Sequence, residues 1–147
     1  MNSEPSIALG LLQIWIVRRP FPHAGDYWES NWLDVTARCD GVGSRIEVTG
    51  RFLHLGEIRR WKKDLESYYA TPSSRVELST MEPTLKVAIG AQNSKTGHMD
   101  CTVALTGDHM SEKHSFSFEI DQSYLPALIT QLGAVLREYP IQDEGNG

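Results

Sequence analysis

The sequence predicts an α+β domain in which a single antiparallel sheet of about seven strands carries two helices on one face, in the order βββα-ββββα. Seven segments alternate between apolar and polar residues, two longer segments repeat apolar residues with a helical period, and the connections between strands are short. Parallel strands would need long crossover connections, so the short ones indicate antiparallel pairing. We expect residues 1–147 to form one domain, with mobile polar tails at 1–6 and 141–147.

The first three strands are expected at 11–18, 31–39 and 44–53. A loop rich in proline follows the first strand, and the glycines of 40–43 mark a hairpin between the second and third. In 31–39 one phase is apolar and the other polar, which is typical of a strand with one buried face.

A helix is expected at 55–69, because Ile58, Trp61 and Leu65 fall on one helical face. The basic residues around Trp61 superficially suggest a nucleic-acid site. However, Trp61 belongs to the apolar face, and the basic side chains can pair with acidic ones four residues later. The net charge of -5 and the pI near 5.5 also weigh against a nucleic-acid partner.

The second half of the chain repeats the pattern of strands followed by a helix. Asp121 is a plausible N-cap for the final helix, and Pro140 prevents its continuation. The expected strands and the final helix are 75–79, 84–90, 98–106, 114–120 and 122–138. This order hints at two similar halves.

If both helices cover the apolar face, the opposite face of the sheet is an open polar surface. Its candidate binding residues are Asp34, Arg38, Glu47 and Arg51. Three of them, Asp34, Glu47 and Arg51, could instead serve a small-ligand or hydrolytic site. Alternating charges across strands are also the usual way to stabilise a solvated sheet face. Pairing of two copies of the chain through an edge strand or this face is a third alternative.

A second candidate surface is the loop from 21 to 32, which holds Tyr27, Trp28 and Trp32 close together in the sequence. Tyrosine and tryptophan are preferred anchors of protein interfaces. The alternative is that the loop folds back and caps one end of the sheet. Both interpretations stay open at this point.

No residue pattern indicates catalysis, a cofactor or a metal. The five histidines lack metal-binding spacing. Cys39 and Cys101 fall on apolar phases of strands, which favours buried free thiols over a disulfide between neighbouring strands. The apolar segment 7–12 is too short for a membrane span and lacks the basic residues of a signal peptide. We therefore expect a cytoplasmic protein without a membrane partner.

Three segments show a resemblance to a known family. They are Asp26-Tyr27-Trp28-Glu29-Ser30-Asn31-Trp32-Leu33, then Phe52-Leu53 before the first helix, and Phe118-Glu119-Ile120-Asp121-Gln122-Ser123-Tyr124-Leu125. Over about 11–138 the chain resembles the WapI-type family of small bacterial proteins. The segment 18–22 and the basic first helix depart from the looser family pattern.

The resemblance implies an immunity protein that binds and neutralises a secreted polymorphic toxin delivered between competing bacteria. It carries over no catalytic residues and names no particular toxin. Acidic immunity proteins often meet basic toxins, which agrees with the net charge here. Our hypothesis is a non-enzymatic binding protein that presents either the open polar face or the aromatic loop to a protein partner.

Overall fold

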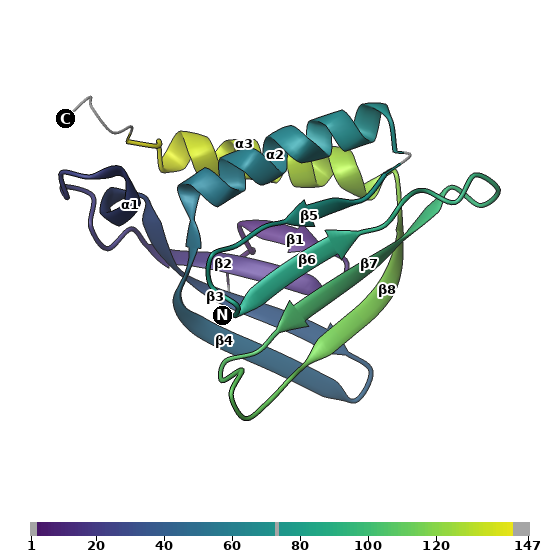
Figure 1. Cartoon of the computed structure of the whole chain (residues 1–147), viewed down its shortest axis with the longest axis horizontal. Coiled ribbons are helices and arrows are strands. Elements are labelled where there is room, and N and C mark those ends of the chain that lie inside the picture. The colour runs from purple at the N-terminus through teal and green to yellow at the C-terminus, as the bar shows by residue number, and fades with distance from the viewer. Residues whose placement is uncertain (1–2, 73, 143–147) are drawn as a thin grey trace.

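The computed structural model describes residues 3–72 and 74–142. It shows an α+β fold with two four-stranded antiparallel sheets and three helices (Figure 1). The elements are β1 (Ile7–Leu9), β2 (Leu12–Arg18), α1 (Tyr27–Ser30), β3 (Trp32–Gly41), β4 (Ser44–His54), α2 (Leu55–Ala70), β5 (Val76–Leu78), β6 (Leu85–Ile89), β7 (His98–Leu105), β8 (Ser115–Asp121) and α3 (Tyr124–Glu138).

The antiparallel pairing is confirmed, but the single seven-stranded sheet is wrong. One sheet has the order β1-β2-β3-β4 and the other the order β5-β6-β7-β8. Short turns predict which consecutive strands pair, but they do not show that pairing stops where α2 separates β4 from β5. The apolar segment that precedes the first expected strand forms an additional strand, β1. The chain turns from β1 back onto β2 at Gly10, which has φ +57°.

The two halves of the chain share one arrangement, because each contains four consecutive antiparallel strands followed by a long helix. The helices α2 and α3 pack on each other and lie side by side over one end of the sheets (Figure 1). Helix α2 contacts β5, and α3 contacts β1, so each long helix packs on the first strand of the other half. Both long helices therefore connect the two halves.

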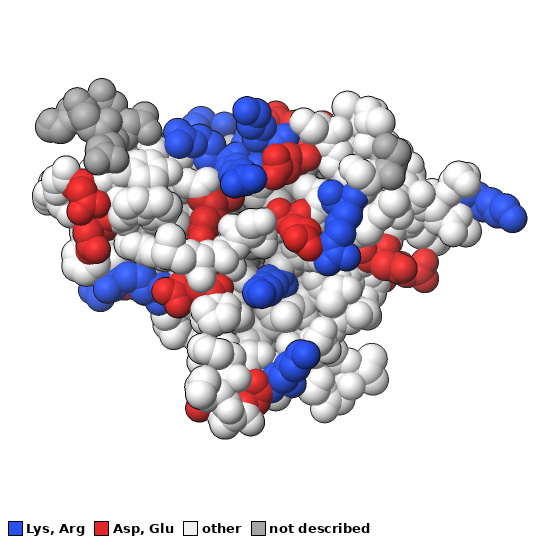
Figure 2. Space-filling model, in the orientation of Figure 1, with Lys and Arg blue, Asp and Glu red and all other residues white. Residues whose placement is uncertain are grey.

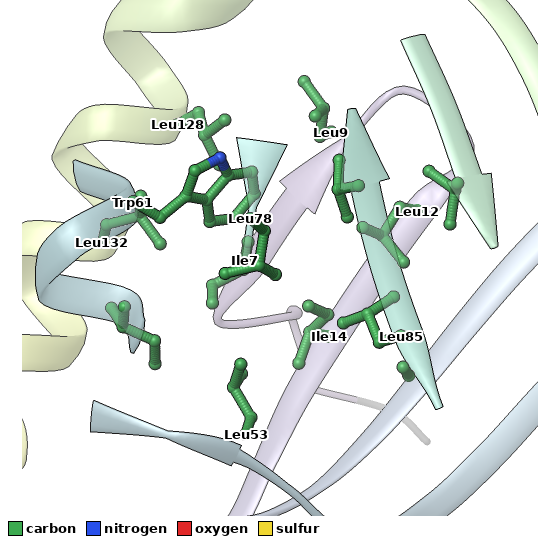
Figure 3. Close-up of a cluster of buried hydrophobic side chains, with 14 of the residues drawn as sticks. Ile7, Leu9, Leu12, Ile14, Leu53, Trp61, Leu78, Leu85, Leu128 and Leu132 are labelled. Carbon is green, nitrogen blue, oxygen red and sulfur yellow. The ribbon is translucent and has the colours of Figure 1, made fainter. Parts of the chain in front are cut away.

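The core lies between the two sheets and beneath the long helices. We expected both helices to cover the apolar face of one sheet, whereas β7 of one sheet packs on β3 and β4 of the other. Trp61 is buried as predicted and lies beside Leu128 and Leu132 of α3 (Figure 3). The outer polar phases of the strands remain toward the outside, which preserves the alternation that the sequence showed.

Two phenylalanine rings of strand β8 pack closely on two glycines in the first half of the chain. A Cβ atom at Gly10 would overlap the ring of Phe118, and one at Gly41 would lie 2.8 Å from the ring of Phe116. Both phenylalanines are partly buried and pack against the core. Because these glycines have no side chain, two aromatic rings of the second half can pack closely on the first half.

The two cysteines are buried free thiols, as predicted. Cys39 lies in β3 and Cys101 in β7, so they belong to opposite sheets rather than to neighbouring strands of one sheet. Burial raises the pKa of Cys39 to about 11 and that of Cys101 to about 12. Both thiols are therefore protonated at neutral pH and behave as small apolar side chains.

The start of α3 differs from the prediction. Ser123, not Asp121, occupies the N-cap position, and its side chain forms no capping bond. Asp121 instead ends β8, and its Oδ1 atom accepts a hydrogen bond from the Ser123 backbone N–H at 2.8 Å. The carboxylate thus lies two residues before the N-cap but still accepts a backbone N–H at this junction.

Residues 1–2 and 143–147 of the expected mobile tails lie outside the described residues. The described ends make contacts, since the Ser3 carbonyl accepts from Trp15 Nε1 and the Gln142 backbone N–H donates to Asn31 Oδ1. The mobility of the tails stays a prediction. Within the described part of the chain, the helices lack the length and apolar character for crossing a membrane.

Candidate functional site

The aromatic loop contains a four-residue helix, α1, where the sequence predicted irregular structure. Asp26 caps it, because its Oδ1 atom accepts from the Trp28 backbone N–H at 2.8 Å. Behind the helix, Arg19 donates to Asn31 Oδ1 at 2.8 Å. These bonds fix the loop from both ends, so Tyr27 and Trp28 sit on an ordered support.

The ring of His54 lies at the centre of the three predicted aromatic residues. Its centroid is 5.2 Å from that of Tyr27 and 5.0 Å from those of Trp28 and Trp32. His54 is 1% exposed, ends β4 and caps α2, where its Nδ1 atom accepts from the Gly56 backbone N–H at 3.0 Å. The histidine therefore joins the aromatic loop to the start of α2.

The buried His54 ring is held in its neutral form. Burial lowers its pKa from 6.5, the charges of Arg19 and Arg59 lower it further, and the backbone of Trp28 and Tyr27 acts in the opposite direction. Because Nδ1 accepts a hydrogen bond, the ring proton belongs on Nε2. The buried Nε2 atom has no partner in good hydrogen-bond geometry among residues 3–72 and 74–142, although the backbone of Trp28 and Tyr27 lies near enough to favour the protonated ring.

A hollow of about 430 Å³ lies beside these rings, between α1, the start of α2 and the segment after β5. We call it the aromatic hollow. Its lining residues are Tyr27, Trp28, His54, Gly56, Glu57, Arg60, Ser79, Thr80 and Met81. Trp28 is 51% exposed and Met81 is 61% exposed, so the hollow carries two large apolar side chains open to solvent.

Glu57 ties two sides of the aromatic hollow together. Its Oε1 atom accepts from the His54 backbone N–H at 2.9 Å, and its Oε2 atom accepts from the Met81 backbone N–H at 2.6 Å. Burial raises the pKa of Glu57, the charge of Glu82 adds to this rise, and the two hydrogen bonds oppose it. The carboxyl group therefore accepts hydrogen bonds from two backbone N–H groups and holds Met81 next to α2.

Gly56 gives Tyr27 the space that its position requires. A Cβ atom at Gly56 would overlap the Tyr27 hydroxyl oxygen and would lie 3.1 Å from His54 Nδ1. The glycine is in the first turn of α2. Its missing side chain thus lets α1 approach the helix closely.

The other candidate surface, the polar outer face of the first sheet, carries charged side chains that pair with one another. Asp34 is 9% exposed and accepts from Arg18 at 2.8 Å and from Arg51 at 2.9 Å. Burial alone would raise the pKa of Asp34, but the hydrogen bonds and charges of Arg51 and Arg18 together lower it. Arg51 also stacks over the ring of Phe21, 4.6 Å from its centroid.

Arg38 has a similar set of contacts on this face. It donates to Gln13 at 2.6 Å, lies 3.3 Å from Asp40, and stacks 5.0 Å from the ring centroid of Trp15. Glu47 is its register partner on β4. A general acid needs a pKa near the working pH, so the lowered pKa of Asp34 does not favour that role.

The structure thus brings Tyr27, Trp28 and Trp32 together around His54, whereas Asp34 and Arg38 contact other side chains. The sequence had not singled out the other contributors to the hollow, among them His54, Glu57, Arg60 and Met81. One signal was present, because His54 and Glu57 have the three-residue spacing of a capping box.

A larger trough of about 680 Å³ lies between α2 and β5. Serine and threonine are frequent in its lining, and Arg75 and Glu77 pair with each other there at 2.8 Å. The smaller aromatic hollow differs from this trough in that it exposes tryptophan and methionine next to an arginine. Among the described residues, no three His, Cys, Asp or Glu side chains gather as they would at a metal site.

Comparisons with known proteins identify one family. A model described as the immunity protein WapI-like family matches residues 6–140. No curated protein matches the chain. The crystal structure of WHY1 from Arabidopsis thaliana is similar, with a TM-score of 0.44 and 12% identity, over 88% of this chain and 78% of that one. Similarity at this level gives no information about activity.

Proposed function

Because the chain belongs to the WapI-like immunity protein family, we propose that it acts in the cytoplasm as a non-enzymatic immunity protein. In this proposal it binds a toxin domain directly and thereby neutralises it. The aromatic hollow is the main contact surface. The observation that carries the proposal is the half-exposed Trp28 beside the exposed Met81. Tryptophan, tyrosine, methionine and arginine are enriched at protein interfaces, and all four line the hollow.

The support beneath Trp28 strengthens this proposal. Exposed aromatic side chains on a mobile loop lose conformational freedom when they bind, and that loss weakens the complex. Here Asp26 caps the helix that bears Trp28, and the ring of Trp28 packs at a tilt against the buried ring of His54. The side chain is therefore placed before a partner arrives.

The outer face of the first sheet is the weaker candidate for the partner surface. Its carboxylate Asp34 already holds two arginines, and Arg38 already pairs and stacks within the chain. A partner would have to compete with these contacts. We therefore rank a small-ligand, hydrolytic or dimerising role of this face below the immunity role.

The proposal is tested by recovering the partner and measuring protection. The tagged chain is used to capture its partner from the secreted proteins of the producing cells, and the toxic domain of that partner is expressed in a heterologous host. We expect the chain to restore growth and to form a complex of fixed stoichiometry with the domain. A chain that captures no toxic protein, or that restores growth without forming a complex, contradicts the proposal.

Two variants then locate the surface. Trp28→Ala should abolish protection, because it removes the exposed ring at the hollow. Tyr69→Ala is the matched control, since Tyr69 is another exposed aromatic residue, 42% exposed and near the end of α2. Tyr69→Ala should protect as well as the unmodified chain. Equal protection by both variants would place the partner elsewhere.

A further inference from the structure

The chain is acidic overall, but α2, whose start lines the aromatic hollow, carries four basic residues. Lysine and arginine side chains gather over α2 (Figure 2). Those of α2 are Arg59, Arg60, Lys62 and Lys63. Lys62 pairs with Glu66 at 3.3 Å, whereas Arg60 Nε lies 3.9 Å from Asp64 Oδ2, at the outer limit of an ion pair. Arg60 is thus only loosely held.

Arg60 is also the member of this group that lines the hollow. Its side chain is 76% exposed, so its guanidinium group can bind an incoming carboxylate. Glu57 lies in the same lining, but both of its oxygens already accept backbone N–H groups. Burial lowers the pKa of His54, and the positive charges of Arg19 and Arg59 lower it further.

We infer that the partner fills the aromatic hollow with an aromatic or long apolar side chain and places a carboxylate next to it on Arg60. This inference rests on the proposed function and specifies the chemistry of the partner. The volume of about 430 Å³ is in the range in which proteins seat small ligands, so a large side chain fits. Trp28 and Met81 provide the apolar contact.

Arginine suits this role better than lysine would. Its planar group can donate two parallel hydrogen bonds to one carboxylate, which fixes the direction of the partner segment as well as its charge. The inferred contact therefore runs against the overall charge of the chain. An acidic surface attracts a basic partner over long distances, while Arg60 selects an acidic group at the point of contact.

The test measures the affinity of the captured partner domain for charge variants of the full chain. Arg60→Glu should weaken binding at least tenfold, and Arg60→Gln should weaken it less. Lys95→Glu is the matched control, because it makes the same charge change at an exposed position in the β6–β7 connection. That connection lies at the end of the molecule opposite α1 (Figure 1). Lys95→Glu should bind within about twofold of the unmodified chain, because distant surface charges are screened by salt.

The outcomes separate this inference from the proposed function. If Trp28→Ala loses binding while Arg60→Glu binds equally or more tightly, the hollow is the interface but the acidic contact is wrong. If Arg60→Glu and Lys95→Glu weaken binding equally, the effect is one of overall charge and the inference is also wrong. If Trp28→Ala and Arg60→Glu both bind normally, the proposed surface and the inferred contact both fail.

Discussion

The close approach of α1 to α2 can be tested by filling the space at Gly56. In Gly56→Ala the new methyl group meets the Tyr27 hydroxyl and approaches His54 Nδ1 to 3.1 Å. A glycine-to-alanine change inside a helix would by itself stabilise the protein by roughly 0.5–1 kcal/mol. Overpacking of a close contact costs about 1–3 kcal/mol. We therefore expect a net destabilisation of up to about 2.5 kcal/mol.

A double-mutant cycle isolates the contact. Tyr27→Phe removes the hydroxyl that the methyl group would meet, so Gly56→Ala should cost at least about 1 kcal/mol less in that background. The free energies of unfolding are measured by urea titration, with tryptophan fluorescence as the signal. Coupling below about 0.5 kcal/mol, or stabilisation by Gly56→Ala alone, would show that Tyr27 does not rest on Gly56.

Three further predictions concern stability. Gly10→Ala should destabilise the protein more than Gly43→Ala by about 1–3 kcal/mol in urea titrations. Both residues have positive φ, but only at Gly10 would the new methyl group meet a phenylalanine ring. Equal losses of stability would show that Phe118 does not pack on Gly10. Because the pKa of Asp34 is lowered, its contribution is present at neutral pH and is lost as the pH falls below about 3.8. Asp34→Asn should therefore lower the free energy of unfolding by about 1–2 kcal/mol at pH 7, a range kept small because solvent screens the exposed arginine side chains. The loss should become smaller as the pH of the unfolding measurement is lowered. A loss that does not change with pH would refute the ion pairs. The lowered pKa of His54 predicts that the free energy of unfolding decreases as the pH falls below 6.5. His54→Asn, which can still cap α2, should remove that part of the pH dependence. If the free energy of unfolding of this variant changes with pH as steeply as before, the ring of His54 is not buried in its neutral form.

Local patterns in the sequence predicted most of the elements. The alternation in 31–39 predicted β3, and the helical spacing of Ile58, Trp61 and Leu65 predicted α2 and its buried face. These signals act over a few residues, so the sequence contains them directly. The division into two sheets depends on contacts between β7 and the strands of the first half, which no local period reveals.

The candidate site was predictable only in part. The cluster of Tyr27, Trp28 and Trp32 was visible in the sequence, because these residues lie close together along the chain. Met81 and Arg60 join them only after α2 and the segment following β5 fold against α1. The central position of His54 likewise depends on the end of β4 meeting α1, although its capping spacing with Glu57 was a local sign. The hollow thus depends on contacts between distant parts of the chain, and the sequence alone shows only its aromatic side.

The most direct test of the aromatic hollow as the partner surface is the affinity of the captured toxin domain for Trp28→Ala, measured by calorimetry beside Tyr69→Ala. A buried tryptophan at the centre of an interface contributes about 2 kcal/mol or more, so we expect the dissociation constant to rise roughly 30-fold or more. Tyr69→Ala should leave it within about twofold, since surface substitutions outside an interface change little. A Trp28→Ala variant that binds as tightly as the unmodified chain would show that the aromatic hollow is not the partner surface.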